Sequence, residues 1–153
     1  MKILLVLMSF FVLISAEPIK TTKDDICLIR KLKVYKAPTW VSKITMKNGK
    51  VALFCSPKSM FDFYFDPSRF EEYELKDNLD IAEILVTDYN TLEAIDATKA
   101  YFVFGSSNIS PAGDDLPAFS SEEDAKKYMK EHNGKRILNF KEVTKGLIDY
   151  LNM

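Results

Sequence analysis

The sequence contains few of the residues that enzymes use for catalysis. Its 153 residues include five glycines and a single histidine, His132. His132 stands where a helix is expected to end, a position that favours a cation, so we interpret it as a solvated helix-terminal residue. No G-x-S-x-G, H-E-x-x-H or glycine-rich phosphate motif occurs. Glu71-Glu72 and Asp114-Asp115 lie in polar stretches and are expected to be solvated. We therefore expect that the protein is not an enzyme.

An excess of charge of one sign is also missing. The chain has 21 Lys and Arg residues against 22 Asp and Glu residues, a net charge of −1. No basic stripe or cluster accompanies this balance, and such a stripe is the electrostatic mark of nucleic-acid binding. We expect no nucleic-acid partner.

Long hydrophobic runs are limited to one short segment near the start. Residues 3–14 are apolar apart from Ser9, a run of about 12 residues where a membrane span needs roughly 20. Lys2 precedes this run and Ala16-Glu17-Pro18 follows it, which predicts a signal peptide over residues 1–16. An uncleaved anchor is the alternative. Because Glu17, and not a cysteine, directly follows the predicted cleavage site, we expect no lipid or other stable membrane anchor, and a soluble periplasmic location.

The two cysteines, Cys27 and Cys55, both follow the predicted cleavage site. A cysteine pair in an exported protein most often forms a disulfide. Thiolate and thioether ligands also favour Cu(I), and a helix N-terminus predicted just after Cys55 lowers the pKa of a thiol. Met60 is one helical turn further on, and Met46 lies in the strand before. Cys27, Cys55, Met60 and Met46 are therefore the candidate metal ligands, although both methionines can equally be core residues.

The first half of the chain predicts a hairpin, a helix and a strand. Asn48-Gly49 separates two alternating runs and indicates a two-residue hairpin turn, which would pair Met46 with Val51. Side chains alternate along strands, so one face would carry Trp40, Ser42, Ile44, Met46, Val51, Leu53 and Cys55. Ser56 and Pro57 favour a helix start there, ending near residue 66. A strand is expected over residues 80–89.

The second half repeats a similar order of elements. Strands are expected over residues 100–104, 117–119 and 137–140, with a helix from Ser121 to His132 and a closing helix over 141–151. Overlaying the halves places Cys55 opposite Ser120. We predict an α+β fold of two ββαβ halves, residues 17–93 and 94–153, with helices packed on antiparallel or mixed sheets.

The chain contains, in order, Cys27, the hairpin, Phe54-Cys55-Ser56, and the runs Ala100–Ser106, Ser121–Ala125 and Gly134–Phe140. These segments resemble the nitrous-oxide-reductase accessory protein family, NosL. The resemblance covers residue 27 to about residue 145. It implies an exported protein that binds Cu(I) and delivers it to a periplasmic copper enzyme such as nitrous oxide reductase. It also implies two related strand–strand–helix–strand halves.

The sequence departs from the motifs of that family at three places. The family commonly opens with C-x-x-C-G-M, whereas only Cys27 of that motif is present here. Ala112 stands where many members have a loop methionine, and no lipidation cysteine occurs. What carries over is Cys27 and Cys55, with Met60 nearby, so the resemblance leaves two interpretations open. One is a Cu(I)-binding accessory protein, and the other is a metal-free interaction module with a Cys27–Cys55 disulfide.

Overall fold

The computed structural model describes residues 16–153, so nearly all of the predicted signal peptide lies outside the described residues. The elements are β1 (Ser42–Met46), β2 (Val51–Phe54), α1 (Pro57–Phe65), β3 (Ile81–Thr87), β4 (Ala94–Asp96), β5 (Tyr101–Phe104), β6 (Ala118–Phe119), α2 (Glu122–Glu131), β7 (Arg136–Asn139) and α3 (Lys145–Leu151). All paired strands are antiparallel. The predicted α+β class is confirmed.

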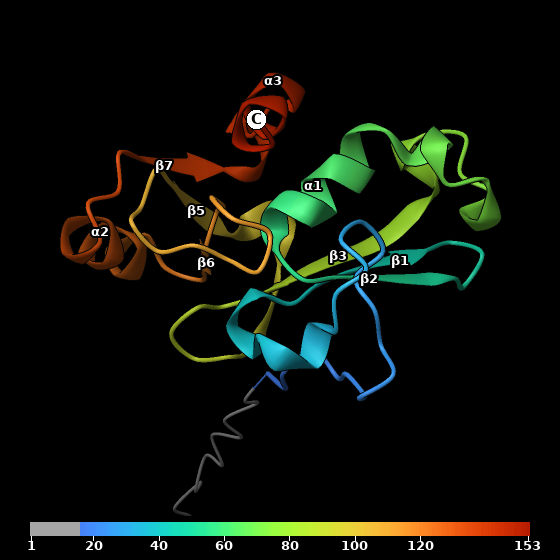
Figure 1. The fold of residues 1–153 in the computed structure, drawn as a ribbon, viewed down its shortest axis with the longest axis horizontal. Helices are drawn as coiled ribbons and strands as arrows, with labels where there is room; N and C mark the ends of the chain where they lie inside the picture. The colour runs from blue at the N-terminus through green and yellow to red at the C-terminus, as the bar shows by residue number, and fades with distance from the viewer. Residues whose placement is uncertain (1–15) are drawn as a thin grey trace, which may run out of the picture.

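The strands form two separate sheets with the helices outside them. The first sheet has the order β2-β1-β3-β4 and the second the order β6-β5-β7. Helix α1 lies over the first sheet, α3 lies beside α1, and α2 lies next to the second sheet at the far end of the molecule (Figure 1). The chain end that follows α3 is therefore close to α1.

The hairpin is present, but its predicted register is wrong by one residue. Thr45 pairs with Val51, and the Met46 amide donates to the Lys50 carbonyl at 2.9 Å. The loop has three residues and ends at Gly49, whose φ of +86° suits glycine and adds a bulge. Because side chains alternate, this shift reverses the faces of β2. Ala52 and Phe54 are buried with Ser42, Ile44 and Met46, whereas Val51 is exposed.

The closing helix begins later than predicted. The Asn139 side chain caps a 3₁₀ turn over residues 140–142 and forms a reciprocal capping box with Glu142. The backbone then becomes extended at Val143 and Thr144, and the Thr144 hydroxyl accepts from the Leu147 amide to start α3 at Lys145. Two successive caps therefore divide a stretch whose spacing predicts one helix.

Strand β4 was not predicted, because three residues are too few to show a periodicity. The Asp88 carboxylate accepts from the amides of Asn90 and Thr91 and turns the chain back along β3. Residues 94–96 then pair with residues 85–87 in the first sheet. The segment assigned to the start of the second half thus completes the sheet of the first half.

The two sheets share one main hydrophobic core. Phe61 on α1 contacts Phe102 of β5 and Phe140, with ring centroids 5.3 and 5.0 Å apart. A smaller cluster of Val103, Phe119, Ala125 and Tyr128 lies under α2. Helix α1 therefore packs against both halves, and its N-terminus contacts Asp115 from the second half.

Candidate metal site

Cys27 is carried by a tight loop that docks on the free edge of β2. An isolated bridge joins Ile26 to Lys33, and the Cys27 amide donates to the Leu32 carbonyl at 2.8 Å. The Leu28 amide donates to the Leu53 carbonyl at 2.9 Å, which ties the loop to β2. Cys27 is thereby placed at the end of the hairpin and is fully buried.

Cys55 lies at the junction between β2 and α1. Ser56 caps the helix by accepting from the Ser59 amide, and Pro57 takes the first helical position, as predicted. The Cys55 sulfur lies 4.0 Å from the Ser59 hydroxyl oxygen, and the residue is 1% exposed. Both cysteines are free thiols in the structure.

The two thiols are hydrogen-bonded to each other, and this contact shifts their pKa values in opposite directions. The Cys55 thiol donates to the Cys27 sulfur, which lowers the pKa of Cys27 from 9.0 to about 6. Burial opposes this shift, and the Arg30 amide, 3.4 Å from the sulfur, supports it. The same hydrogen bond and burial raise the pKa of Cys55. Of the two thiols, Cys27 is therefore the one that ionises first.

The two candidate methionines lie on different elements, Met60 in the first turns of α1 and Met46 at the end of β1. Cys55 precedes the cap and Met60 is the fourth helical residue, two positions whose side chains typically pack together at a helix start. Met60 is fully buried. Met46 is also buried, but it lies four residues along β1 from Ser42, which pairs with Phe54. At about 3.3 Å per residue, Met46 is roughly 13 Å from Ser42 along the strand.

A buried aspartate closes the site from the other half of the chain. Asp115 is 3% exposed, so the expectation that Asp114-Asp115 is solvated is wrong for this residue. Its carboxylate accepts from the Lys58 amide at 2.8 Å and from the Ser110 hydroxyl at 2.7 Å. Burial raises the pKa of Asp115. This carboxylate occupies the N-terminus of α1, whose own first turn has no acidic residue.

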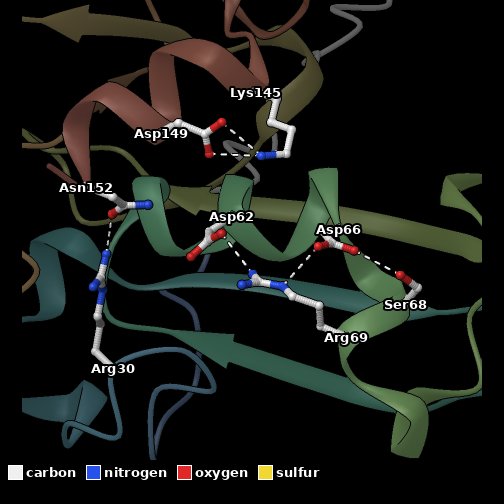
Figure 2. Close-up of polar contacts among 8 residues, drawn as sticks. All are labelled: Arg30, Asp62, Asp66, Ser68, Arg69, Lys145, Asp149 and Asn152. Carbon is white, nitrogen blue, oxygen red and sulfur yellow. Dashed lines mark hydrogen bonds and ion pairs between the residues drawn. The ribbon is translucent and has the colours of Figure 1, made fainter.

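Lys58 and Arg30 join the site to the end of α3, and sequence reasoning missed both. Lys58 is 2% exposed, and burial lowers the pKa of its amine while Asp115 opposes that shift. The Arg30 guanidinium donates to the Asn152 side chain, which joins the Cys27 loop to the end of α3 (Figure 2). The Lys58 amine donates to the Leu151 carbonyl and joins α1 to the same end. A lysine in the first turn of a helix opposes the helix dipole, and that conflict was the available signal in the sequence.

The arrangement suits a soft ion of low coordination number. Across residues 16–153, no group of three or more His, Cys, Asp and Glu side chains is arranged to hold a metal. The site offers two thiols and a neighbouring thioether, which are ligands that Cu(I) prefers, whereas structural zinc sites use four ligands. A groove of about 470 Å³ lies beside the Cys27 loop, with Leu28, Val51, Leu53 and Tyr73 also in its lining.

The structure is that of a small α+β protein with a buried thiol pair, and comparison with known proteins gives its family. Residues 18–148 match the family model NosL. The chain is 30% identical over 135 residues to the copper-binding lipoprotein NosL of Stutzerimonas stutzeri, covering 88% of this chain and 70% of that protein. The protein belongs to the NosL family.

A solved structure supports the same fold. The crystal structure of the copper chaperone NosL from Shewanella denitrificans superposes with a TM-score of 0.69 at 23% identity. The match covers 86% of this chain and 98% of that one. Among residues 16–153, the structure contains no helix with the length and hydrophobicity of a membrane span.

Proposed function

We propose that this protein binds one Cu(I) ion as cargo through the sulfurs of Cys27 and Cys55 and delivers it to an exported copper enzyme. The observation that carries this proposal is the hydrogen bond between the two buried thiols, because it holds two soft ligands within reach of one ion. The names of the two NosL relatives, a copper-binding lipoprotein and a copper chaperone, support the same ion. The protein acts as a carrier and not as an enzyme.

Met60 supplies the third ligand in this proposal, and Met46 remains a core residue. The position of Met60 at the start of α1 supports its role, and the distance of Met46 along β1 argues against that residue. The ionised Cys27 thiol binds the ion first, and the Cys55 proton is released as the second sulfur binds. The target is a periplasmic copper enzyme of the nitrous oxide reductase type, and the protein reaches that compartment through its signal peptide.

The test is an anaerobic titration of the reduced, exported protein with Cu(I) against a competing chelator. We expect one equivalent bound, lost in Cys27→Ser and in Cys55→Ser, weakened in Met60→Leu and unchanged in the matched control Met46→Leu. Protein that is isolated with a complete disulfide and retains no Cu(I) after mild reduction would overturn the proposal. That result would favour a metal-free interaction module in which the disulfide contributes about 2–4 kcal/mol to stability.

A further inference from the structure

Neither thiol is open to solvent in the metal-free protein. Cys27 is 0% exposed and Cys55 is 1% exposed. A metal ion can therefore reach or leave the two sulfurs only after one of the segments that carry them moves. Cys55 leads directly into α1, which packs in the main core. The loop that follows Cys27 is less buried, since Lys31 and Leu32 are exposed, so this loop is the segment that opens more easily.

The segment that follows Cys55 is tied to the end of α3 by Lys58. The Lys58 amine donates to the Leu151 carbonyl at 3.0 Å and to the Ala112 carbonyl at 2.7 Å. The last carbonyls of a helix have no partner within that helix, so the amine satisfies one of them. Because Lys58 is buried, little water competes for this contact. The end of α3 is therefore fixed to the first turn of α1.

The loop that follows Cys27 is tied to the same end of α3 by Arg30. The Arg30 guanidinium donates to the side chain of Asn152, the residue that ends α3 (Figure 2). The Arg30 amide donates to the Cys27 sulfur at 3.4 Å, so the position of this residue also affects the position of the thiol. Within residues 16–153, the guanidinium makes no other hydrogen bond, and its Nε atom is buried without an acceptor. A buried donor without an acceptor is unfavourable, so one contact decides whether this side chain stays in place.

Resting on the proposed function, we propose that Arg30 and Asn152 form a latch that holds the Cys27 loop closed and sets the rate at which the metal ion enters and leaves. Arg30 is a positioning residue, because it acts through the loop and does not bind the ion. When the latch opens, the Leu28 amide still donates to the Leu53 carbonyl, so the movement stays local. The latch closes the empty and the loaded site alike, and its loss therefore raises both rates and leaves Kd unchanged.

The experiment measures how fast the loop opens, with and without copper. In the metal-free protein, the rate of Cys27 alkylation by iodoacetamide reports the opening, and peptide mass spectrometry locates the modified residue. In the Cu(I)-loaded protein, an excess of bathocuproine disulfonate reports the release rate, and titration with the same chelator gives Kd. Asn152→Ala removes the acceptor, whereas Asn152→Asp keeps an acceptor oxygen. The matched control is Lys145→Ala, which removes an exposed ion pair with Asp149 on the same helix (Figure 2).

We expect Asn152→Ala to raise the alkylation rate of Cys27 and the release rate of Cu(I) by about fivefold, the effect of losing one hydrogen bond. Kd and the urea midpoint should not change, since Asn152 is exposed and is not a ligand. Arg30→Gln removes the other partner and should give the same increases. Asn152→Asp and Lys145→Ala should keep both rates at the wild-type value.

Three results would overturn the latch. The first is an unchanged pair of rates in Asn152→Ala and Arg30→Gln. The second is an equal increase in the control Lys145→Ala, which would mean that any loosening of α3 has this effect. The third is an increase in Asn152→Asp as large as that in Asn152→Ala, which would mean that the acceptor oxygen is not what holds the loop.

A failure of the proposed function gives a different result from a failure of this inference. Wild-type protein that binds no Cu(I) through Cys27 and Cys55 overturns the proposed function, whatever the alkylation rates are. Wild-type protein that binds Cu(I) tightly, with alkylation and release rates that do not respond to Asn152 or Arg30, overturns only the latch.

Discussion

The two junctions that lead from a strand into a helix, Phe54–Ser56 and Phe119–Ser121, share a local structure and differ in what surrounds them. Each has a buried phenylalanine, then one variable residue, then a serine that caps the helix. Cys55 is buried against Cys27, whereas Ser120 is exposed and donates to the Asp88 carboxylate at 2.7 Å. The same backbone arrangement therefore supports a thiol pair at one end of the molecule and a hydroxyl–carboxylate contact at the other.

The helix N-termini at these junctions are also stabilised differently. The first turn of α2 contains three acidic residues of its own, Glu122, Glu123 and Asp124. The first turn of α1 contains none, and Asp115 from a distant loop supplies the negative charge. Helix α2 is thus stabilised locally, whereas α1 depends on tertiary contacts that also enclose the thiols.

The largest expected effect comes from moving the thiol between the junctions. The double variant Cys55→Ser with Ser120→Cys keeps the number of cysteines but should lose Cu(I) binding, because position 120 faces Asp88 and not Cys27. The competition titration measures this directly. Retention of one tightly bound Cu(I) in the double variant would mean that Cys55 is not the ligand we propose.

The next effect tests whether the two halves unfold together. Phe54→Ala and Phe119→Ala each remove a fully buried ring and should each reduce the free energy of unfolding by about 3–5 kcal/mol. Urea unfolding followed by circular dichroism should show one transition in both, since the main core spans both sheets. Leu79→Ala, at a side chain that is 75% exposed, should change stability by less than about 0.5 kcal/mol. Two separate transitions would contradict a shared core.

A smaller effect distinguishes the acidic groups at the two helix starts. Asp115→Asn disrupts hydrogen bonds to the Ser110 hydroxyl and the Lys58 amide in a buried position, and should cost about 1–3 kcal/mol of stability. Asp124→Asn changes a more accessible charge at the start of α2 and should cost about 0.3–1 kcal/mol. Equal losses in urea unfolding would show that α1 does not depend on the buried carboxylate.

The smallest effect is the pH dependence that Cys27 contributes. Its pKa is lowered from 9.0 to about 6, so between these pH values the unfolded chain binds more protons than the folded protein. Stability from this group therefore rises with pH across that window and is lost as the pH falls through about 6. Ultraviolet absorbance should detect one thiolate titrating near pH 6. Cys55→Ser should move this midpoint upward, and an unchanged midpoint would exclude the hydrogen bond as its main cause.

Much of the fold follows from local signals, and the errors arise where those signals are short or ambiguous. Asn48-Gly49, Ser56-Pro57 and Ser121 with Asp124 act within a few residues, and all three mark real turns or helix starts. The predicted hairpin register is wrong because an Asn-Gly pair is compatible with both a two-residue and a three-residue loop. Strand β4 depends on pairing with β3, which its own three residues do not encode.

The sequence predicts the two cysteines of the candidate site but not the buried charged side chains near them. Cysteines are rare in this chain, and so Cys27 and Cys55 are conspicuous from the amino-acid sequence alone. The polar neighbours of Asp115 predict a solvated loop residue, which is wrong because the carboxylate is buried. Burial depends on how residues 110–115 dock on α1, and this docking joins residues 57 positions apart in the sequence.

The sequence by itself determined the class of fold, the positions of most strands and helices, and the two thiols as the chemistry most worth testing. These features depend on the residue types and on interactions over a few positions. Only the tertiary structure decided that Cys27 and Cys55 are buried together with opposite pKa shifts, that Met46 lies four residues along β1 from Ser42, and that Asp115 is buried at the N-terminus of α1. The physical reason is that burial and electrostatic interactions are set by segments far apart in the chain, which the folded core brings into contact.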